Sequence, residues 1–310
     1  MERGTAKIVL IGAAFLAAAG LSVCLNGLSS PAAPATASAG AGAAREFRYN
    51  RVICMSPAVT EIVFALGAGP RVVGVSDYTM YPPDAVAKPT CGGFINPNHE
   101  RILSLEPDLI VTQGEAADLT SFARDNGIEM LVLSLTDLDS IYRQTRKVGA
   151  ALQLDAEAGL VCAEMQYSIA KVRARVSHHP PVPAVMVTGH EPGSLNGISV
   201  VGPGTFLSDV LDAAGGRNVF ADLHTSYAVV SKEALLERAP EVVIELHGEG
   251  SDQRARQEEA RRLWQGLAPL PAVRDGRVHV LEATYAMIPG PRVAMLAEGL
   301  AAILHPEDGQ

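Results

Sequence analysis

The chain has 310 residues, enough for one large or two ordinary domains, and 48% of them are hydrophobic while 19% are charged, so a well-buried core is feasible. Its formal net charge of −9 argues against a nucleic-acid-binding protein, which needs a basic face for the phosphates. No run of Lys and Arg offers such a face, and we therefore expect no nucleic acid among its partners.

The amino terminus has the pattern of a secretory targeting segment. Arg3 and Lys7 precede an apolar run, residues 8–20, which is short for a membrane span because a span needs roughly 20 apolar residues. We assign residues 1–23 to a signal peptide and expect the mature protein outside the cytoplasm. Residues 24–46 are rich in Ala, Pro, Ser and Gly, which predicts a disordered tether.

The processing of this segment has three alternatives. Leu21-Ser-Val-Cys24 looks like a lipoprotein box, in which the cysteine is lipidated after cleavage. Val23 departs from the small residue that usually precedes such a cysteine, and Ala37-Ser-Ala39 offers an ordinary cleavage site instead. The alternatives are therefore a lipid anchor on Cys24, simple secretion and an uncleaved anchor.

Short aliphatic strands alternate with helices from residue 47 onward. In the first half the expected strands are 51–55, 71–75, 109–112 and 130–133, and the expected helices are 61–66, 117–126 and 141–152. In the second half the expected strands are 184–187, 242–246 and 277–281, and the expected helices are 205–214, 231–238, 254–264 and 292–304. This alternation predicts an α/β fold with parallel sheets covered on both faces, whose ligands bind beyond the carboxyl ends of the strands.

A long helical segment, residues 155–176, separates the two halves and contains no proline. At about 1.5 Å per residue it spans roughly 33 Å, the size of a domain. We therefore expect two Rossmann-like lobes joined by one long rigid helix, with little lobe movement because a helix without a proline break hinges poorly. The expected boundaries are 47–153 for the amino-terminal lobe, 154–178 for the inter-lobe helix and 179–306 for the carboxy-terminal lobe.

One stretch of sequence occurs twice, and its copies begin at Glu100 and Glu233. In each copy a short apolar run follows the glutamate, then a proline, an acidic residue and an aliphatic strand. An aromatic residue, Phe94 or Tyr227, lies six residues before the glutamate. The repeat predicts two similar lobes with two equivalent acidic corners and two aromatics that face a common space.

The two glutamates have a simpler explanation as well. An acidic side chain in the first turn of a helix interacts favourably with the helix dipole, by about 0.3–1 kcal/mol. That effect accounts for one glutamate, whereas a matched pair with one member in each lobe favours a docking role toward basic residues of a partner.

The sequence contains no recognisable catalytic or metal site, since it lacks a phosphate loop, a nucleophile elbow and an HExxH motif. We expect no catalytic residue, resident metal or cofactor. His190 and His224 are candidate ligand-binding residues, because both fall in loops expected to face the cleft. Cys54, Cys91 and Cys162 lack metal-site spacing, and a Cys54–Cys91 disulfide is the alternative to the favoured interpretation, buried free thiols.

Aromatic residues form only 5% of the chain, yet Tyr78, Phe94, Tyr227 and Tyr285 all fall in loops after expected strands. Loop aromatics on both lobes suit a large flat or apolar ligand, held by burial and stacking. Tyr81, which precedes two prolines, is expected instead to fill the base of its loop.

Several short motifs, distributed over most of the chain, share one resemblance. They are Arg51-Val-Ile-Cys-Met-Ser-Pro-Ala-Val-Thr-Glu61, Val73-Gly-Val-Ser-Asp-Tyr78 with Tyr81-Pro-Pro83, Asn98-His-Glu-Arg101 with Glu106-Pro-Asp-Leu109, Gly215-Gly-Arg-Asn218 and Val230-Ser-Lys-Glu233. With these motifs, residues 51–304 resemble the periplasmic binding proteins of ABC importers for cobalamin, ferric siderophores and haem, the class with a single rigid helix between its lobes.

The resemblance is nearest to the cobalamin-binding members and implies roles for individual residues. The implied ligand contacts are Tyr78, Phe94, Tyr227, Tyr285 and Gln113, the last at a position where those members have an aromatic residue. Glu100 and Glu233 match the glutamates that dock onto arginines of the permease. Pro289-Gly-Pro-Arg292, in contrast, resembles the haem and siderophore members.

These observations predict a monomeric periplasmic solute-binding protein that captures a corrinoid such as cobalamin non-covalently and delivers it to an ABC permease in the membrane. Haem or a ferric siderophore is the alternative ligand. A secreted metal-dependent hydrolase that uses the cleft histidines and carboxylates is the alternative from another class, and a sensor or adhesion module on the same scaffold is the third.

Overall fold

The computed structural model describes residues 47–248 and 253–309. The predicted signal peptide, the lipidation candidate Cys24 and the predicted tether lie outside these residues. Within them, no helix combines the length and the apolar character that a membrane crossing requires.

The first sheet is parallel throughout, and its strands follow the order β2-β1-β3-β4. The strands are β1 Val52–Cys54, β2 Val72–Val75, β3 Leu109–Gln113 and β4 Glu129–Leu133. The helices between and after them are α1 Pro57–Ala65, α2 Pro83–Val86, α3 His99–Ser104, α4 Ala117–Asp125 and α5 Leu138–Leu152, with a 3-10 turn at Gly69–Arg71. Alternate residues of β1 and β3 enter different hydrophobic clusters, so helices cover both faces of the sheet, as the aliphatic strands predict.

The second sheet contains the same four-strand parallel arrangement, in the order β7-β5-β9-β10. Its strands are β5 Val182–Gly189, β6 Ile198–Val201, β7 Gly216–Asn218, β8 Tyr227–Val230, β9 Val242–His247 and β10 Val278–Glu282. Strands β6 and β8 extend the sheet from the edge of β5 that also pairs with β7, and both are antiparallel, which the sequence did not predict. The loop from β5 to β6 is too short for the crossover that a parallel pair needs, so β6 must turn back.

The helices of the second half complete this lobe. They are α7 Phe206–Ala213, α8 Lys232–Arg238, α9 Gln253–Trp264, α10 Pro271–Arg274 and α11 Val293–Leu304, with 3-10 turns at Gln265–Leu267 and Pro306–Gly309. One face of the sheet joins the large cluster formed with α7 and α11, and the other face packs around Trp264 in a separate cluster. The expected α/β class, with two sheets, is therefore confirmed.

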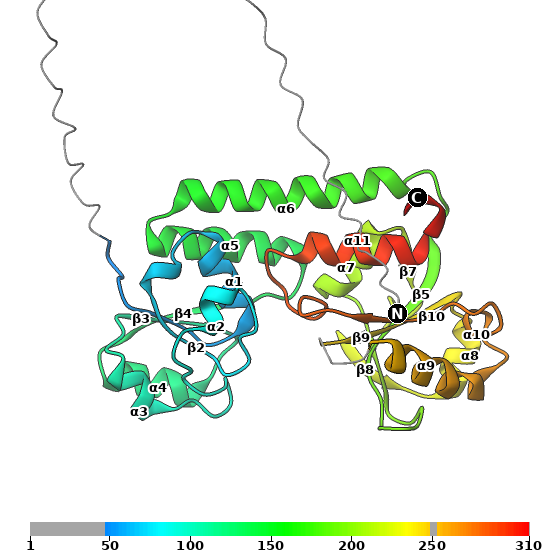
Figure 1. The fold of residues 1–310 in the computed structure, drawn as a ribbon, viewed down its shortest axis with the longest axis horizontal. Helices are drawn as coiled ribbons and strands as arrows, with labels where there is room; N and C mark the ends of the chain where they lie inside the picture. Colours follow the sequence, from blue (N-terminus) through cyan, green and yellow to red (C-terminus); the bar gives the residue numbers. More distant parts are fainter. Residues whose placement is uncertain (1–46, 249–252, 310) are drawn as a thin grey trace, which may run out of the picture. The chain divides into compact units, whose positions relative to one another are not determined.

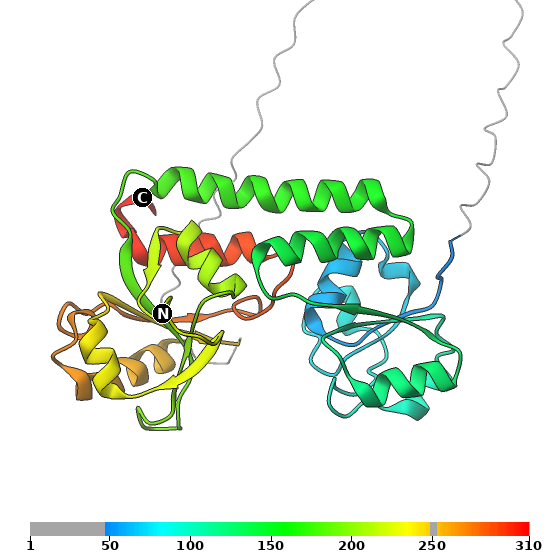
Figure 2. The ribbon, with the colours of Figure 1, turned by 180° about the vertical axis from the view of Figure 1, so that it is seen from behind.

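Helix α6, Asp155–Val176, runs alongside α5 and α11 in both views (Figures 1 and 2), and it packs against α5, α7 and α11. Its buried residues recur every three or four positions, as in a helix with one apolar face: Ala158, Cys162, Met165, Ile169, Val172 and Val176. One helix thus shares a hydrophobic core with helices of both lobes. This agrees with the predicted long helix between them.

The repeated stretch has the same backbone in both copies. Asn98 and Ser231 cap α3 and α8 through their side chains, and Glu106 and Ala239 both adopt the left-handed conformation, with φ of 45° and 46°. The strands β3 and β9 follow, each at the same place in its sheet.

The described cysteines are buried free thiols, as favoured by the sequence analysis. Burial raises the pKa of Cys54, and it raises the pKa of Cys91 to about 11. Both side chains are therefore protonated at neutral pH.

Candidate functional site

A cavity of about 260 Å³ lies where the two lobes meet. Gln113, the last residue of β3, lines it from the amino-terminal lobe, and Tyr227, the first residue of β8, lines it from the carboxy-terminal lobe. The other lining residues are Leu135, Thr136, Gly204, Thr205, Phe206, Ser226, Met287 and Pro289. Two of the predicted ligand contacts are thus brought to one cavity by strand ends of different lobes.

Two further predicted aromatics, Tyr78 and Phe94, lie in loops of the amino-terminal lobe. The ring of Tyr78 packs on the backbone at Gly93, where an added Cβ would lie 2.8 Å from it, and the Tyr78 side chain is 66% exposed. Phe94 is half-buried and approaches Gly114, which directly follows Gln113. Neither aromatic is among the described residues that line the cavity.

A buried ion pair joins the lobes at another point. Arg292, at the start of α11, donates from Nη2 to Glu61 Oε1 at 2.6 Å and from Nε to Glu61 Oε2 at 2.9 Å. Their side chains are 12% and 2% exposed. Burial raises the pKa of Glu61, and the hydrogen bond and charge of Arg292 offset part of that shift. No local sequence pattern indicates this pair, because its members are 231 residues apart.

Arg292 also organises aromatic side chains. Its guanidinium lies 4.1 Å from the ring centroid of Tyr81 and 5.4 Å from that of Tyr285, and its Nη1 donates to Thr284 Oγ1 at 2.7 Å. Tyr285 is half-buried against the core, whereas Tyr81 is 42% exposed rather than filling the base of its loop. The expectation for Tyr81 is therefore wrong, because the guanidinium occupies the space beneath its ring.

The predicted histidines lie elsewhere in the carboxy-terminal lobe. His224 is exposed, beside Asp222, whose carboxylate forms two hydrogen bonds with Arg238. His190 lines a different cavity, of about 510 Å³, and contacts Glu245 there. The described structure therefore does not bring either histidine to the cavity that holds Gln113 and Tyr227.

Glu100 and Glu233 occupy matching positions in the first turns of α3 and α8, and both side chains are exposed. The pKa of Glu233 is lowered by its own backbone N–H and by the hydroxyl of Ser231. Each glutamate is therefore available to a partner on the surface of its lobe.

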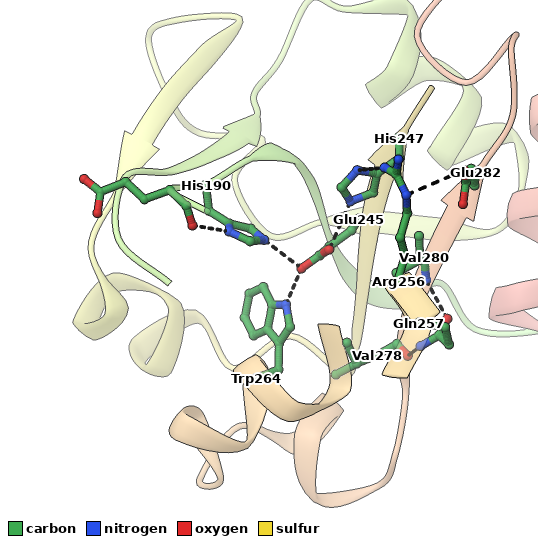
Figure 3. A network of polar contacts seen from close by, with 10 residues as sticks. His190, Glu245, His247, Arg256, Gln257, Trp264, Val278, Val280 and Glu282 are labelled. Carbon is green, nitrogen blue, oxygen red and sulfur yellow. Dashed lines mark hydrogen bonds and ion pairs between the residues drawn. The ribbon is translucent and has the colours of Figure 1, made fainter. Parts of the chain in front are cut away.

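The cavity with His190 contains a polar network that the sequence analysis missed (Figure 3). Glu245, 4% exposed at the end of β9, accepts hydrogen bonds from His247 Nε2 and Trp264 Nε1, and His190 Nε2 lies 3.3 Å from its Oε1. The only sequence signal was an acidic residue within an otherwise apolar strand, followed two positions later by a histidine.

The described chain contains other hollows, and they differ in the residues that line them. A hollow of about 570 Å³ beneath α6 is lined by four aspartates, Arg173 and Tyr142 among others, and Asp212 pairs with Arg173. No group of three or more His, Cys, Asp or Glu residues within 47–248 and 253–309 is placed to hold a metal ion.

Comparison with known proteins identifies similar chains. The family model for periplasmic binding proteins matches residues 52–285. The vitamin B12-binding protein of Vibrio cholerae is 28% identical over 264 residues, which cover 84% of this chain and 91% of the relative.

Solved structures agree with this match. The crystal structure of the periplasmic vitamin B12 binding protein BtuF of Vibrio cholerae superposes with a TM-score of 0.70 at 26% identity, over 84% of this chain and 99% of that one. The periplasmic heme-binding protein RhuT from Roseiflexus superposes with a TM-score of 0.71 at 24% identity, again over 84% and 99%. The fold is therefore common to proteins with different ligands.

Proposed function

Because the chain belongs to the periplasmic binding protein family, we propose that it is the extracytoplasmic solute-binding protein of an ABC importer, which captures a corrinoid such as cobalamin between its lobes. The observation that carries this proposal is the cavity lined by Gln113 from one lobe and Tyr227 from the other. The 28% identity to a vitamin B12-binding protein supports the choice of ligand.

The proposed ligand rests on this cavity rather than inside it. At about 260 Å³ the cavity is smaller than the roughly 300–1,000 Å³ of sites that enclose a drug-sized molecule. We propose that it receives one edge of the corrinoid, with Gln113, Thr136 and Ser226 as polar partners. The exposed rings of Tyr78 and Tyr227 would then contact the ligand's faces, by burial and stacking without a covalent bond.

Haem or a ferric siderophore is the second candidate, and Tyr81 is the observation that favours it. Its phenol ring is 42% exposed and lies against the guanidinium of Arg292. A tyrosine oxygen is an established ligand of haem iron. Cobalamin offers no comparable role for Tyr81.

Titration of the mature protein with cyanocobalamin, hemin and a ferric siderophore tests these candidates. We expect binding of cyanocobalamin at 1:1, measured by equilibrium dialysis, and weaker binding by Tyr227→Ala. If hemin binds instead, Tyr81→Phe should change the absorbance of the bound iron, since it removes only the phenol oxygen. Binding of none of the three, together with zinc in elemental analysis, would favour the hydrolase.

We propose further that the monomer docks onto the permease through Glu100 and Glu233, one corner from each lobe. Reversing both charges to Lys should abolish uptake and leave the ligand Kd unchanged, because the corners lie outside the cavity lining. Glu237→Lys is the matched control, since Glu237 is also exposed on α8. Unimpaired uptake by the double variant would refute the docking role.

The remaining proposals concern the role and location of the chain. The similar proteins are binding proteins, and we propose that this chain likewise binds without catalysis and needs no cofactor. A lipid on Cys24, within a periplasmic location, stays a prediction that mass spectrometry of the membrane-extracted protein would test.

A further inference from the structure

The carboxylate of Glu245 is surrounded by hydrogen-bond donors within the carboxy-terminal lobe (Figure 3). Trp264 Nε1 donates to Oε1 at 2.6 Å, His247 Nε2 lies 3.1 Å from Oε2, and His190 Nε2 lies 3.3 Å from Oε1. Burial raises the pKa of Glu245, but the hydrogen bonds from His247 and Trp264 and the charge of His190 outweigh it, so the pKa lies below its ordinary value. The group is therefore ionised at neutral pH.

The two histidines differ in what their second ring nitrogen faces. His190 Nδ1 lies 3.0 Å from the carbonyl oxygen of Glu191, so acceptors stand at both of its nitrogens. Only the doubly protonated imidazolium can donate to both. His247 Nδ1 lies 3.4 Å from Arg256 Nη1, which is a donor, so the neutral ring of His247 satisfies both of its contacts. His190 is therefore the ring whose hydrogen bonds depend on the doubly protonated form.

The other charged groups around His190 come from three elements. Arg256 and Glu259 of α9 line the same cavity as His190, and Glu282 of β10 lies 3.7 Å from Arg256. The Glu191 side chain, on the loop itself, accepts from Ser194 at 3.4 Å. Both oxygens of Glu282 lack a hydrogen-bond partner in the described chain, so its charge offsets that of Arg256.

The position of His190 links this network to the inter-lobe cavity. The loop of residues 190–197 leads directly into β6, whose last residue Val201 pairs with Tyr227 of β8. Gly202 N then donates to Ser226 O at 2.8 Å. Both Tyr227 and Ser226 line the inter-lobe cavity. The loop that begins at His190 is therefore connected, through β6 and β8, to one wall of that cavity.

We propose that the cluster of His190, Glu245, His247 and Trp264 is a proton-operated latch, in which protonated His190 ties the 190–197 loop to β9 and so holds the β6–β8 edge. Loss of the proton removes one of the two hydrogen bonds of the ring and the charge that faces Glu245, and so weakens the attachment of the loop. The edge is then held at lower pH and released at higher pH. The consequence for ligand release rests on the proposed function.

Trp264 provides a direct reporter, because it is the only tryptophan in the chain and contacts the cluster itself. We expect its emission to change between about pH 5.5 and 8.5, on either side of the ordinary histidine pKa of about 6.5. His190→Gln should abolish the change, and His224→Gln, at an exposed histidine of the same lobe, should retain it. A flat wild-type titration, or an undiminished transition in His190→Gln, would overturn the proposal.

Hydrogen–deuterium exchange, corrected for the intrinsic pH dependence, tests the connection to the edge. Peptides covering residues 190–201 and 227–230 should be about fivefold better protected at pH 6 than at pH 8, as expected for one hydrogen bond. His190→Gln should show no such difference. Equal protection at both pH values in the wild type would refute the latch.

Ligand binding separates the latch from the proposed function. The Kd for cyanocobalamin should be about fivefold higher at pH 8 than at pH 6, again the effect of one hydrogen bond, and independent of pH in His190→Gln. If no chelate binds at either pH, the proposed function fails, while the fluorescence and exchange results still decide the latch.

Discussion

The two lobes place different residues at the same point of equivalent strands. The fourth residue is Thr112 in β3 and Glu245 in β9, and each strand lies between two parallel neighbours. The hydroxyl of Thr112 has no hydrogen-bond partner among the described residues, whereas Glu245 is surrounded by three donors. The strand thus folds without a charge in one lobe, so the buried carboxylate of the other lobe is not required by the fold.

The amino-terminal lobe has a buried carboxylate of its own, Glu61, and its partner is of another kind. Arg292 remains charged at any pH that a folded protein tolerates, and it comes from the opposite lobe. Glu245 contacts two histidines of its own lobe, and histidine is the residue type that switches charge near neutral pH. The Glu61–Arg292 ion pair is therefore a permanent connection between the lobes. The network around Glu245 depends on pH and stays within one lobe.

Removing the positive charge of Arg292 should have the largest effect on stability. Arg292→Met leaves Glu61 buried without its cation, and we expect the free energy of unfolding to fall by about 3–5 kcal/mol. Urea denaturation at pH 7 measures the change.

The double variant Glu61→Leu with Arg292→Met is the control, because an apolar pair of similar volume is often neutral or stabilising in place of a buried ion pair. It should recover most of the lost stability. A loss below about 1 kcal/mol in the single variant would mean that the ion pair does not hold the lobes together.

Breaking the hydrogen-bond network around Glu245 should have an intermediate effect on stability. Glu245→Gln removes the charge that faces His190, and we expect the free energy of unfolding to fall by about 1.5–3 kcal/mol at pH 7, the range for hydrogen bonds to charged groups. The lowered pKa of Glu245 means that its stabilisation is present above the ordinary glutamate value and is lost as the pH falls through the folded value.

The difference between wild type and Glu245→Gln should therefore narrow as the pH is lowered from about 5 to 3, followed by thermal or urea unfolding at each pH. Thr112→Val is the matched variant in the other lobe, and its effect should not depend on pH, because threonine does not titrate. A constant difference between wild type and Glu245→Gln across this range would contradict the ionised state of the carboxylate.

The sequence predicted those features that depend on local pattern. The aliphatic strands and the repeat indicated two α/β lobes. The antiparallel strands β6 and β8 were missed because they are short and only β6 is well buried.

Features that depend on long-range contacts were not predictable in this way. The Glu61–Arg292 pair joins residues 231 positions apart, and no local pattern indicates that they meet. The partners of Glu245 lie in a loop, a strand and a helix, and only His247 is near it in sequence. His190 was predicted to face the cleft because it directly follows a strand. The direction in which its side chain points could not be predicted from the sequence.

The smallest expected effect concerns the feature in which the two lobes agree. Glu106 and Ala239 adopt left-handed backbone angles at the same position of the repeat, each before a proline, and both are exposed. Glycine adopts this conformation without the steric cost of a Cβ, so Glu106→Gly and Ala239→Gly should each raise the free energy of unfolding by about 0.5–1 kcal/mol. Ala234→Gly, inside α8, is the matched control and should lower it by about 1 kcal/mol, because its backbone is helical. Equal gains at the two sites in urea denaturation would show that the copies carry the same strain, so that the lobes differ in their buried charges and not in their shared frame. A loss of stability at either site would mean that the left-handed residue of that copy is held by contacts of its side chain.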